Sequence, residues 1–433
     1  MKKVAVIGAG VSGMTTAHLL KDEANVVVYE KEDKAGGLIK CRRVNGSLFH
    51  TCGGHVFNSK RQDVLDWFWS KFNRDEEFSK ADRNSVVFME TNRGEQLEIP
   101  YPLENHAYLF DSETQKRFIE DLVKLAKNEG TLPNNFEEFL QGRFGNTLYE
   151  LYFKPYNEKV WRRDLKQVPL SWLEGKLPMP TVAEIIYNNI NHVKEKAFVH
   201  STFWYEKQNG SQFLADKLAE GLDIRYNQYI SSICYDGKQW TIGGETFDKV
   251  VFCGNIKDMV NILSGVDIEK YKQPVSALEY HGTTAVFCEI DANPYSWIYQ
   301  PSKAHESHRI ICTGNFSRSN NNNELKEGRI TATIEFTDEI SKENILDNLS
   351  RIPLNPVYLD HKYNQYTYPI QDANTRQMIL DLKDVLSPYG FYFTGRFADW
   401  EYYNMDVAIG AAMDMVKCII SDYNAFMLVL VHT

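Results

Sequence analysis

The stretch "KKVAVIGAGVSGMTTAHLL", residues 2–20, decides the fold of the N-terminal region. It combines a short apolar run, a glycine-rich turn and a segment with helical spacing, and "ANVVVYE", residues 24–30, follows as a second apolar run. Strand, helix and strand in this order indicate a βαβ unit. The charged start and apolar centre could also belong to a secretory signal, but the spacing of the glycines favours the βαβ unit.

The glycine turn is the first candidate binding site. Gly8 permits a tight turn, Gly10 lets the backbone approach a pyrophosphate, and Gly13 lets the helix and the strand pack closely. The helix start, including Ser12, offers free N–H groups to phosphates. Glu30 lies twenty residues beyond Gly10, at the end of the second strand, where a carboxylate accepts hydrogen bonds from ribose hydroxyls. The plain alternative is a glycine-rich turn with an exposed glutamate.

Length and composition narrow the class of protein. With 433 residues, of which 43% are hydrophobic and 13% aromatic, the chain is expected to be globular, with two or three domains. The net charge of −10 argues against a nucleic-acid partner. The sequence has no run of 18 apolar residues, so no membrane-spanning helix is expected. Seven scattered cysteines without a CxxC pair favour reduced thiols in the cytoplasm over disulfides or a metal site.

The order of the periodic segments predicts the domains. Helical spacing runs from about Ser112 to Lys196, and strand patterns dominate from about Pro274 to Tyr366. "FMLVLV", residues 426–431, is expected to be a terminal strand or a docking tail. We predict an α/β chain (α+β overall) with a Rossmann-like domain, a helical insertion and an antiparallel-sheet domain. Their expected ranges are 1–100, 199–270 and 385–425 for the discontinuous FAD-binding domain, 101–198 for the insertion, and 271–384 for the substrate domain.

The segment "YEKEDKAGGLIK", residues 29–40, resembles FAD-dependent enzymes of the amine oxidase and protoporphyrinogen oxidase superfamily. "VVFCGN" (250–255) and "FYFTGRF" (391–397) resemble that superfamily's later returns to the cofactor. The resemblance implies FAD along the first domain, with the closing helix aimed at the flavin. Besides the glycine turn, Ser12 and Glu30, it implies cofactor contacts for Lys31, Gly36, Gly37, Leu38, Gly54, His55, Gly395, Arg396, Asn404 and Met405.

Six segments sharpen the resemblance because they occur in a fixed order along nearly the whole chain. Together they resemble the UDP-galactopyranose mutase family, the eukaryotic type more than the common bacterial type. The segments are "CGGHVF" (52–57), "IPYPLENH" (99–106), "KPYNEKVW" (154–161), "HRIICTGNFS" (308–317), "YTYPI" (366–370) and "GRFADWEYYNMD" (395–406).

This resemblance implies a reaction in which reduced flavin is the nucleophile and displaces UDP from the anomeric carbon of a hexose, so that pyranose and furanose forms interconvert. NAD(P)H is a possible external reductant. The diphosphate leaving group needs cations and hydroxyl donors. The resemblance places Arg309, Arg396, Tyr368 and Tyr402 there, with Asn404 beside them. The alternatives are an exposed strand residue for Arg309, a structural salt bridge for Arg396 and core packing for the tyrosines.

Further roles follow from the same resemblance. It places His55 beside the flavin, and Trp161 and Asn157 in the sugar and nucleotide cleft; the alternative for His55 and Trp161 is ordinary core packing. Tyr101 and Glu104 stand where the family meets uracil, but glutamine is typical at the second position, which leaves the base open. Lys176 stands where the family has an arginine on a closing segment, and its alternative is a solvent-facing lysine.

Three functions remain in competition. The leading one is a flavin-dependent nucleotide-sugar mutase, whose partner is a nucleotide sugar. The second is a redox flavoenzyme of the amine oxidase type, which would not need two diphosphate arginines with paired tyrosines. The third is an FAD-binding protein without catalysis. The sugar and the oligomeric state are left open by the sequence.

Overall fold

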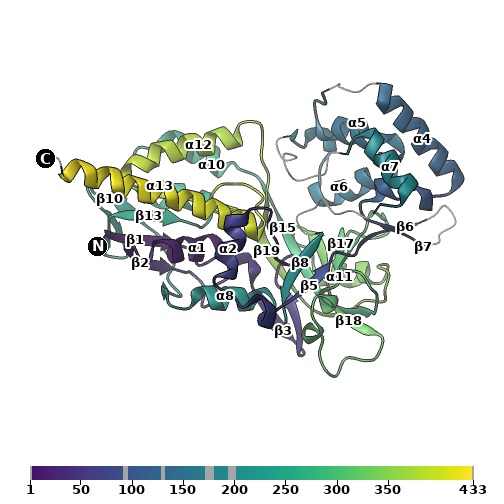
Figure 1. Cartoon of the computed structure of the whole chain (residues 1–433), viewed down its shortest axis with the longest axis horizontal. Coiled ribbons are helices and arrows are strands. Elements are labelled where there is room, and N and C mark those ends of the chain that lie inside the picture. The colour runs from purple at the N-terminus through teal and green to yellow at the C-terminus, as the bar shows by residue number, and fades with distance from the viewer. Residues whose placement is uncertain (1, 91–95, 128–131, 171–179, 194–200, 432–433) are drawn as a thin grey trace.

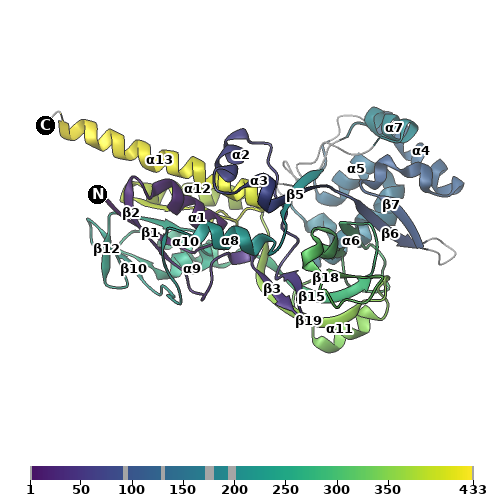
Figure 2. The ribbon, with the colours of Figure 1, turned by 60° about the horizontal axis from the view of Figure 1, so that its bottom comes forward.

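The structure, a computed structural model, describes residues 2–90, 96–127, 132–170, 180–193 and 201–431. A parallel-sheet unit holds both termini at one end, a helical unit lies at the other end, and a large mixed sheet joins them (Figures 1 and 2). The expected fold class is therefore confirmed.

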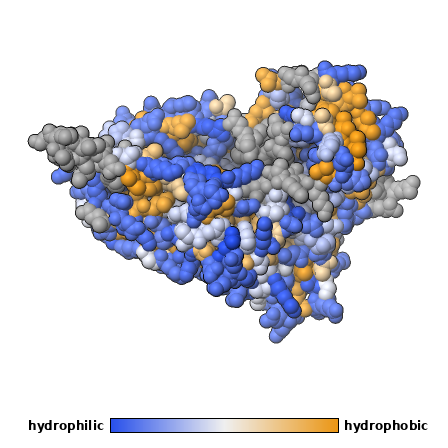
Figure 3. Space-filling model, viewed as in Figure 1, coloured by the Kyte–Doolittle hydropathy of each residue, from blue (hydrophilic) through white to orange (hydrophobic). Residues whose placement is uncertain are grey.

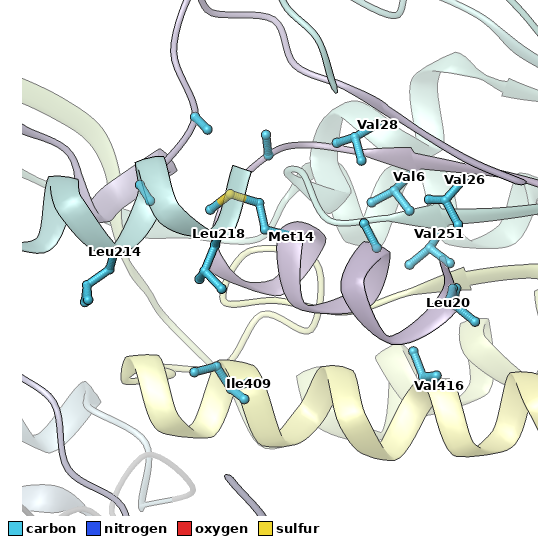
Figure 4. Packing of buried hydrophobic residues seen from close by; sticks show 14 of the residues in the cluster. Val6, Met14, Leu20, Val26, Val28, Leu214, Leu218, Val251, Ile409 and Val416 are labelled. Carbon is cyan, nitrogen blue, oxygen red and sulfur yellow. The ribbon is translucent and has the colours of Figure 1, made fainter. Parts of the chain in front are cut away.

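The parallel sheet is built from the runs that the sequence marks as buried strands. Its order is β20-β13-β1-β2-β9, and all neighbouring strands are parallel. Helix α1 connects β1 to β2 and packs against α13, with Val6, Met14 and Val416 in the shared core (Figure 4). The bounds are β1 (Lys2–Ile7), α1 (Val11–Leu20), β2 (Ala24–Tyr29), β9 (Asp223–Arg225), β13 (Lys249–Phe252), β20 (Phe391–Phe393) and α13 (Met405–Val431).

The C-terminal segment differs from expectation. Helix α13 continues to Val431, so the terminal strand expected for residues 426–431 is wrong. The physical reason is the absence of a helix breaker: no glycine or proline stands between residues 411 and 431.

The remaining elements of this unit cover the two faces of the parallel sheet. Helix α12 lies in the range expected for the second sheet, yet its buried Ile379 and Leu382 pack in the core of the parallel sheet. The other elements are α2 (Gln62–Trp69), α3 (Arg74–Glu77), α8 (Ser211–Ala219), β10 (Ile233–Tyr235), β11 (Trp240–Ile242), β12 (Glu245–Phe247), α9 (Ile256–Ile262), β14 (Leu263–Ser264), α10 (Glu269–Ser276) and α12 (Thr375–Leu386).

The large sheet has the order β19-β15-β18-β17-β16-β6-β7. Its neighbours are antiparallel except β16 and β6, which are parallel. β6 and β7 lie within the range 1–100 that was expected to belong to the first domain. We therefore propose that the first segment of that domain ends before Ser85, where β6 begins. The bounds are β6 (Ser85–Glu90), β7 (Gln96–Pro100), β15 (Tyr280–Asp291), β16 (Trp297–Tyr299), β17 (Arg309–Ile311), β18 (Arg329–Thr337), α11 (Lys342–Leu349) and β19 (Val357–Pro369).

Two ribbons link the units, β3 (Cys41–Val44) with β4 (Ser47–His50), and β5 (Phe78–Asp82) with β8 (Thr202–Glu206). The helical unit has an aromatic core and consists of α4 (Ser112–Lys127), α5 (Phe136–Leu148), a π-helical turn (Tyr149–Phe153), α6 (Lys154–Trp161) and α7 (Val182–Asn191).

Contacts at the C-terminal end of α6 attach the helical unit to the large sheet. The Lys159 ammonium donates to the carbonyls of Gln300 and Ser307, each at 2.8 Å. His281 Nε2 donates to the Trp161 carbonyl at 2.9 Å, and its Nδ1 faces the carboxylate of Asp338. These bonds hold α6, and the residues it carries, in one position against the sheet.

The surface carries apolar side chains on the helical unit, around α4 and α7 (Figure 3). The exposed ones there are Ile119, Val123, Ile186, Tyr187 and Ile190. Among the residues described, no helix combines the length and the apolar character needed to cross a membrane.

Candidate functional site

A cavity of about 550 Å³ opens where the parallel sheet meets the large sheet. It begins at the β1–α1 turn and the end of β2, and it extends to the start of α13. Of the expected cofactor residues, the cavity is lined by Gly8, Gly10, Ser12, Glu30, Lys31, Gly36, Gly37, Leu38, His55, Gly395, Arg396, Asn404 and Met405.

The three glycines of the first turn have different environments. Gly8 has a φ of +104°, in the region that favours glycine. A Cβ on Gly13 would overlap the carbonyl oxygen of Gly8, so Gly13 serves the packing of α1 and does not line the cavity. A Cβ on Gly10 would meet no protein atom within 4 Å. It would project into free space beside the cavity, where only a ligand would meet it.

Glu30 is buried at the end of β2, and its carboxylate is held by backbone. One oxygen accepts the N–H of Ala9 at 2.7 Å, and the other accepts the N–H of Glu32 at 3.0 Å. Each carboxylate oxygen has a second lone pair. The carboxylate is thus fixed in direction and can still accept hydroxyl donors from a ligand in the cavity.

His55 lies at the other end of the cavity. Its Nε2 lies 3.0 Å from the carbonyl oxygen of Leu38, and the ring also forms a hydrogen bond with the backbone of Cys52. Burial and, to a smaller extent, the charges of the nearby Arg396 and Arg309 together lower the pKa of His55 to about 4. The imidazole is therefore neutral at pH 7. Gly54 does not line the cavity. It packs against Ile311, with which a Cβ on Gly54 would collide.

Two arginines and two tyrosines meet beside this end. The rings of Tyr368 and Tyr402 stack with centroids 5.3 Å apart and planes within 7°. Arg396 lies over the Tyr402 ring, 4.6 Å from its centroid, and Arg309 Nη2 donates to the Tyr368 hydroxyl at 3.0 Å. Four residues from three separate sequence segments thus form one cluster.

Arg396 is held by backbone rather than by a carboxylate. Its guanidinium donates to the carbonyl of Tyr403 through Nε at 2.9 Å and to the carbonyl of Thr367 through Nη1 at 3.2 Å. The turn before it is fixed by Asp399, whose carboxylate accepts from the Gly395 N–H and the Thr394 hydroxyl, both at 3.0 Å. The positive charge of Arg396 therefore remains available to an anionic ligand.

Glu335 on β18 was not found by the sequence analysis. Its carboxylate is only 1% exposed; one oxygen accepts from Arg309 Nε, and the other accepts from the Gly53 N–H at 2.9 Å. Glu335 thus joins the arginine cluster to the loop that carries His55. The signal was present in "RITATIEFT", residues 329–337, where alternation puts Glu335 on a polar face with threonines.

Tyr101, which was expected at the nucleotide, belongs to an aromatic wall between the helical unit and the large sheet. The rings of Tyr101 and Tyr299 lie 4.8 Å apart, and the Tyr156 ring lies 5.7 Å from that of Tyr299. Arg309 acts on Tyr156 and lowers its pKa, against the stronger effect of burial, so the wall borders the arginine cluster. Tyr156 and Tyr299 were missed by the sequence analysis.

Three other expected substrate residues lie outside the described cavity. Asn157 donates to the Phe153 carbonyl at 2.7 Å within its own helix. Trp161 is 4% exposed and belongs to the aromatic core of the helical unit, and Glu104 is 3% exposed in a short turn. Lys176 lies outside the described residues.

Comparison with known proteins gives three findings. Residues 6–72 match the NAD(P)-binding Rossmann-like domain family. The chain is 21% identical over 423 residues to UDP-galactopyranose mutase of Mycoplasma pneumoniae, covering 94% of each protein. A crystal structure of reduced UDP-galactopyranose mutase superposes with a TM-score of 0.83 at 21% identity, over 97% of this chain and 94% of that one. The resemblance to these mutases is confirmed.

A second mutase extends the comparison to another nucleotide. dTDP-fucopyranose mutase of Escherichia coli is 27% identical over 184 residues, which cover 41% of this chain and 46% of that protein. The two mutases differ by name in both base and sugar. The similarity to the mutases extends to the fold and to most of the chain length, but it does not identify the substrate.

Proposed function

We propose that this chain is an FAD-dependent nucleotide-sugar mutase that interconverts the pyranose and furanose forms of a nucleoside-diphosphate hexose. The observation that carries the proposal is the cluster of Arg309, Arg396, Tyr368 and Tyr402 beside the far end of a dinucleotide-type cavity. A diphosphate leaving group needs such donors, because negative charge grows on it as the sugar bond breaks.

The residues present fit FAD. The cavity runs from a fixed ribose-type carboxylate, Glu30, past the open face of Gly10 to the neutral His55. The start of α1 presents its free N–H groups to the same space, which suits a diphosphate. A bound, reduced flavin would supply the nucleophile for the anomeric carbon.

The chain's own residues would position the substrate and neutralise the charge of its diphosphate. Arg309 is held by Glu335, so its remaining N–H groups keep a fixed direction. Arg396 supplies a charge that no carboxylate cancels among the described residues. Neutral His55 is held by the backbone of Leu38 and Cys52 and brings no positive charge near the flavin end. Tyr156 and Tyr299 line the way toward the helical unit, where a nucleoside could stack.

The deciding experiment incubates the dithionite-reduced protein with UDP-galactopyranose, and separately with dTDP-linked hexopyranoses, and separates the products by chromatography. We expect a furanose product from at least one of them and none from the air-oxidised protein. Full activity of the oxidised protein would contradict the proposal. Consumption of one oxygen molecule per turnover would instead support a redox flavoenzyme of the amine oxidase type.

A further inference from the structure

One wall of the cavity comes from the large sheet and not from the Rossmann-like unit. Five consecutive residues of the edge strand β19, from Lys362 to Tyr366, line the same cavity as the glycine turn. The pairing of β19 with β15 is interrupted next to this segment, since Thr283 pairs with Asn364 but His281 pairs with Tyr368. The strand therefore bulges where it borders the cavity.

Neighbouring contacts fix the direction of Lys362. Side chains two residues apart on a strand share a face, so Asp360, Lys362 and Asn364 point the same way. Asp360 pairs with Arg42 on β3, and Asn364 donates to the Thr51 carbonyl at 2.6 Å, just after β4. Lys362 therefore points toward the ribbon that follows the Gly36–Gly37 segment, on the cofactor side of the sheet.

The charge of Lys362 is not cancelled by a contact within the protein. Among the residues that the structure describes, its ammonium has no hydrogen bond and no ion pair, and it is half-buried. Its charge acts on Glu32, whose pKa is raised by partial burial but lowered more by Lys40, with a smaller contribution from Lys362. Glu32 is already paired with Lys40, which also lines the cavity.

We infer that Lys362 binds the diphosphate bridge of the bound dinucleotide from the large-sheet side of the cavity. The inference rests on the FAD binding proposed above. The diphosphate is the permanently anionic part of such a cofactor, and the start of α1 can approach it from one side only. A lysine acts on phosphate as a point charge and needs no particular geometry, so a strand from the other unit can supply it. The cofactor would then bridge the two sheets.

The test titrates FAD into the full-length chain freed of flavin and follows protein fluorescence at low ionic strength. We expect Lys362→Gln to weaken FAD binding by about tenfold, which is the usual effect of one charge-assisted contact. Lys362→Arg keeps the charge and should stay within about threefold of the wild type. The matched control is Lys326→Gln, an exposed lysine in a loop away from the cavity, with no expected change.

A second readout separates charge from packing. The difference between the wild type and Lys362→Gln should shrink as salt is raised, because mobile ions screen a partly exposed charge. Equal FAD affinity of the wild type and Lys362→Gln at low salt would overturn the inference, as would a loss that salt does not change. If the wild type itself binds no FAD, the proposed function fails first, and the two failures are distinguishable.

Discussion

Arg309 and Glu335 form an ion pair that is largely shielded from water. Moving a carboxylate out of water costs several kcal/mol, and a paired cation together with hydrogen bonds offsets that cost. Glu335 has both, through Arg309 and the Gly53 N–H. The geometry of the pair is therefore needed for stability as well as for orienting the guanidinium.

Replacing Glu335 tests the first of these roles. Glu335→Ala leaves a largely buried guanidinium unpaired, so we expect the free energy of unfolding to fall by about 3–5 kcal/mol. Urea denaturation followed by fluorescence measures the change. Glu343→Ala, at an exposed position of α11, is the control. A loss below about 1 kcal/mol would show that the pair behaves like a surface salt bridge.

Arg309 itself tests the diphosphate role. Arg309→Ala should lower kcat/KM by roughly ten- to a hundredfold on the true substrate, because one charge-assisted contact is worth about 1.5–3 kcal/mol. The FAD content should stay near that of the wild type, since Arg309 does not line the cofactor cavity. Arg396→Ala should lose similar activity, and its flavin content must be measured because Arg396 does line that cavity. Unchanged kinetics in both variants would remove the diphosphate assignment.

His55 makes a prediction about pH. Its pKa is about 4 in the folded chain and about 6.5 when unfolded, so the unfolded chain binds more protons between these values. Stability should fall as pH drops from 6.5 toward 4. His55→Gln should flatten this part of the profile, measured by urea denaturation at several pH values. His50 and His305, with pKa values lowered to about 3 by burial, should keep the remaining slope.

At the scale of elements, the β1–α1 turn separates folding from binding. A Cβ on Gly13 would overlap the Gly8 carbonyl, so Gly13→Ala should lower the melting temperature, by about 1–2 °C for each kcal/mol lost in a chain of this length. A Cβ on Gly10 meets no protein atom. Gly10→Ala should therefore fold with a near-normal melting temperature in the flavin-free state and bind FAD poorly. Normal FAD binding by Gly10→Ala would place the phosphates elsewhere.

The elements that local pattern controls were predictable, and those that depend on distant partners were not. The apolar runs of β1 and β2 and the helical spacing of α1 are sufficient to predict these three elements from the local sequence. β6 and β7 read as strands, but nothing local shows that β6 pairs in parallel with β16, more than 200 residues later. Residues 426–431 have strand-like composition, yet the preceding helix simply continues through them.

The same distinction applies to the site. The glycine turn and Glu30 have a fixed spacing, so their meeting at one cavity follows from the βαβ unit. The cluster of Arg309, Tyr368 and Arg396 was reached through resemblance, because its members come from three distant segments. Glu335 and Lys362 were missed because each depends on a strand pairing and on contacts that one sequence does not reveal.

At the scale of the whole molecule, the attachment of the helical unit to the large sheet is open to test. His281→Ala removes the donor to the Trp161 carbonyl and leaves Asp338 without its ring partner. We expect a loss of about 1–3 kcal/mol and faster hydrogen exchange of the α6 amides. Exchange in α12, which packs in the other unit, serves as the internal control. Unchanged exchange in α6 would show that the remaining contacts of Lys159, Val160 and Arg162 are sufficient to hold the helix.

The π-helical turn at Tyr149–Phe153 affects how relatives are compared. It places one extra residue between α5 and α6, and one residue of a helix corresponds to a rotation of about 100°. Tyr156 and Trp161 lie after this turn. In a relative with a regular helix at this place, the corresponding residues would lie on a different face of the helix. An alignment between the two therefore requires a one-residue gap inside the helix, and without it each role would be transferred to a neighbour.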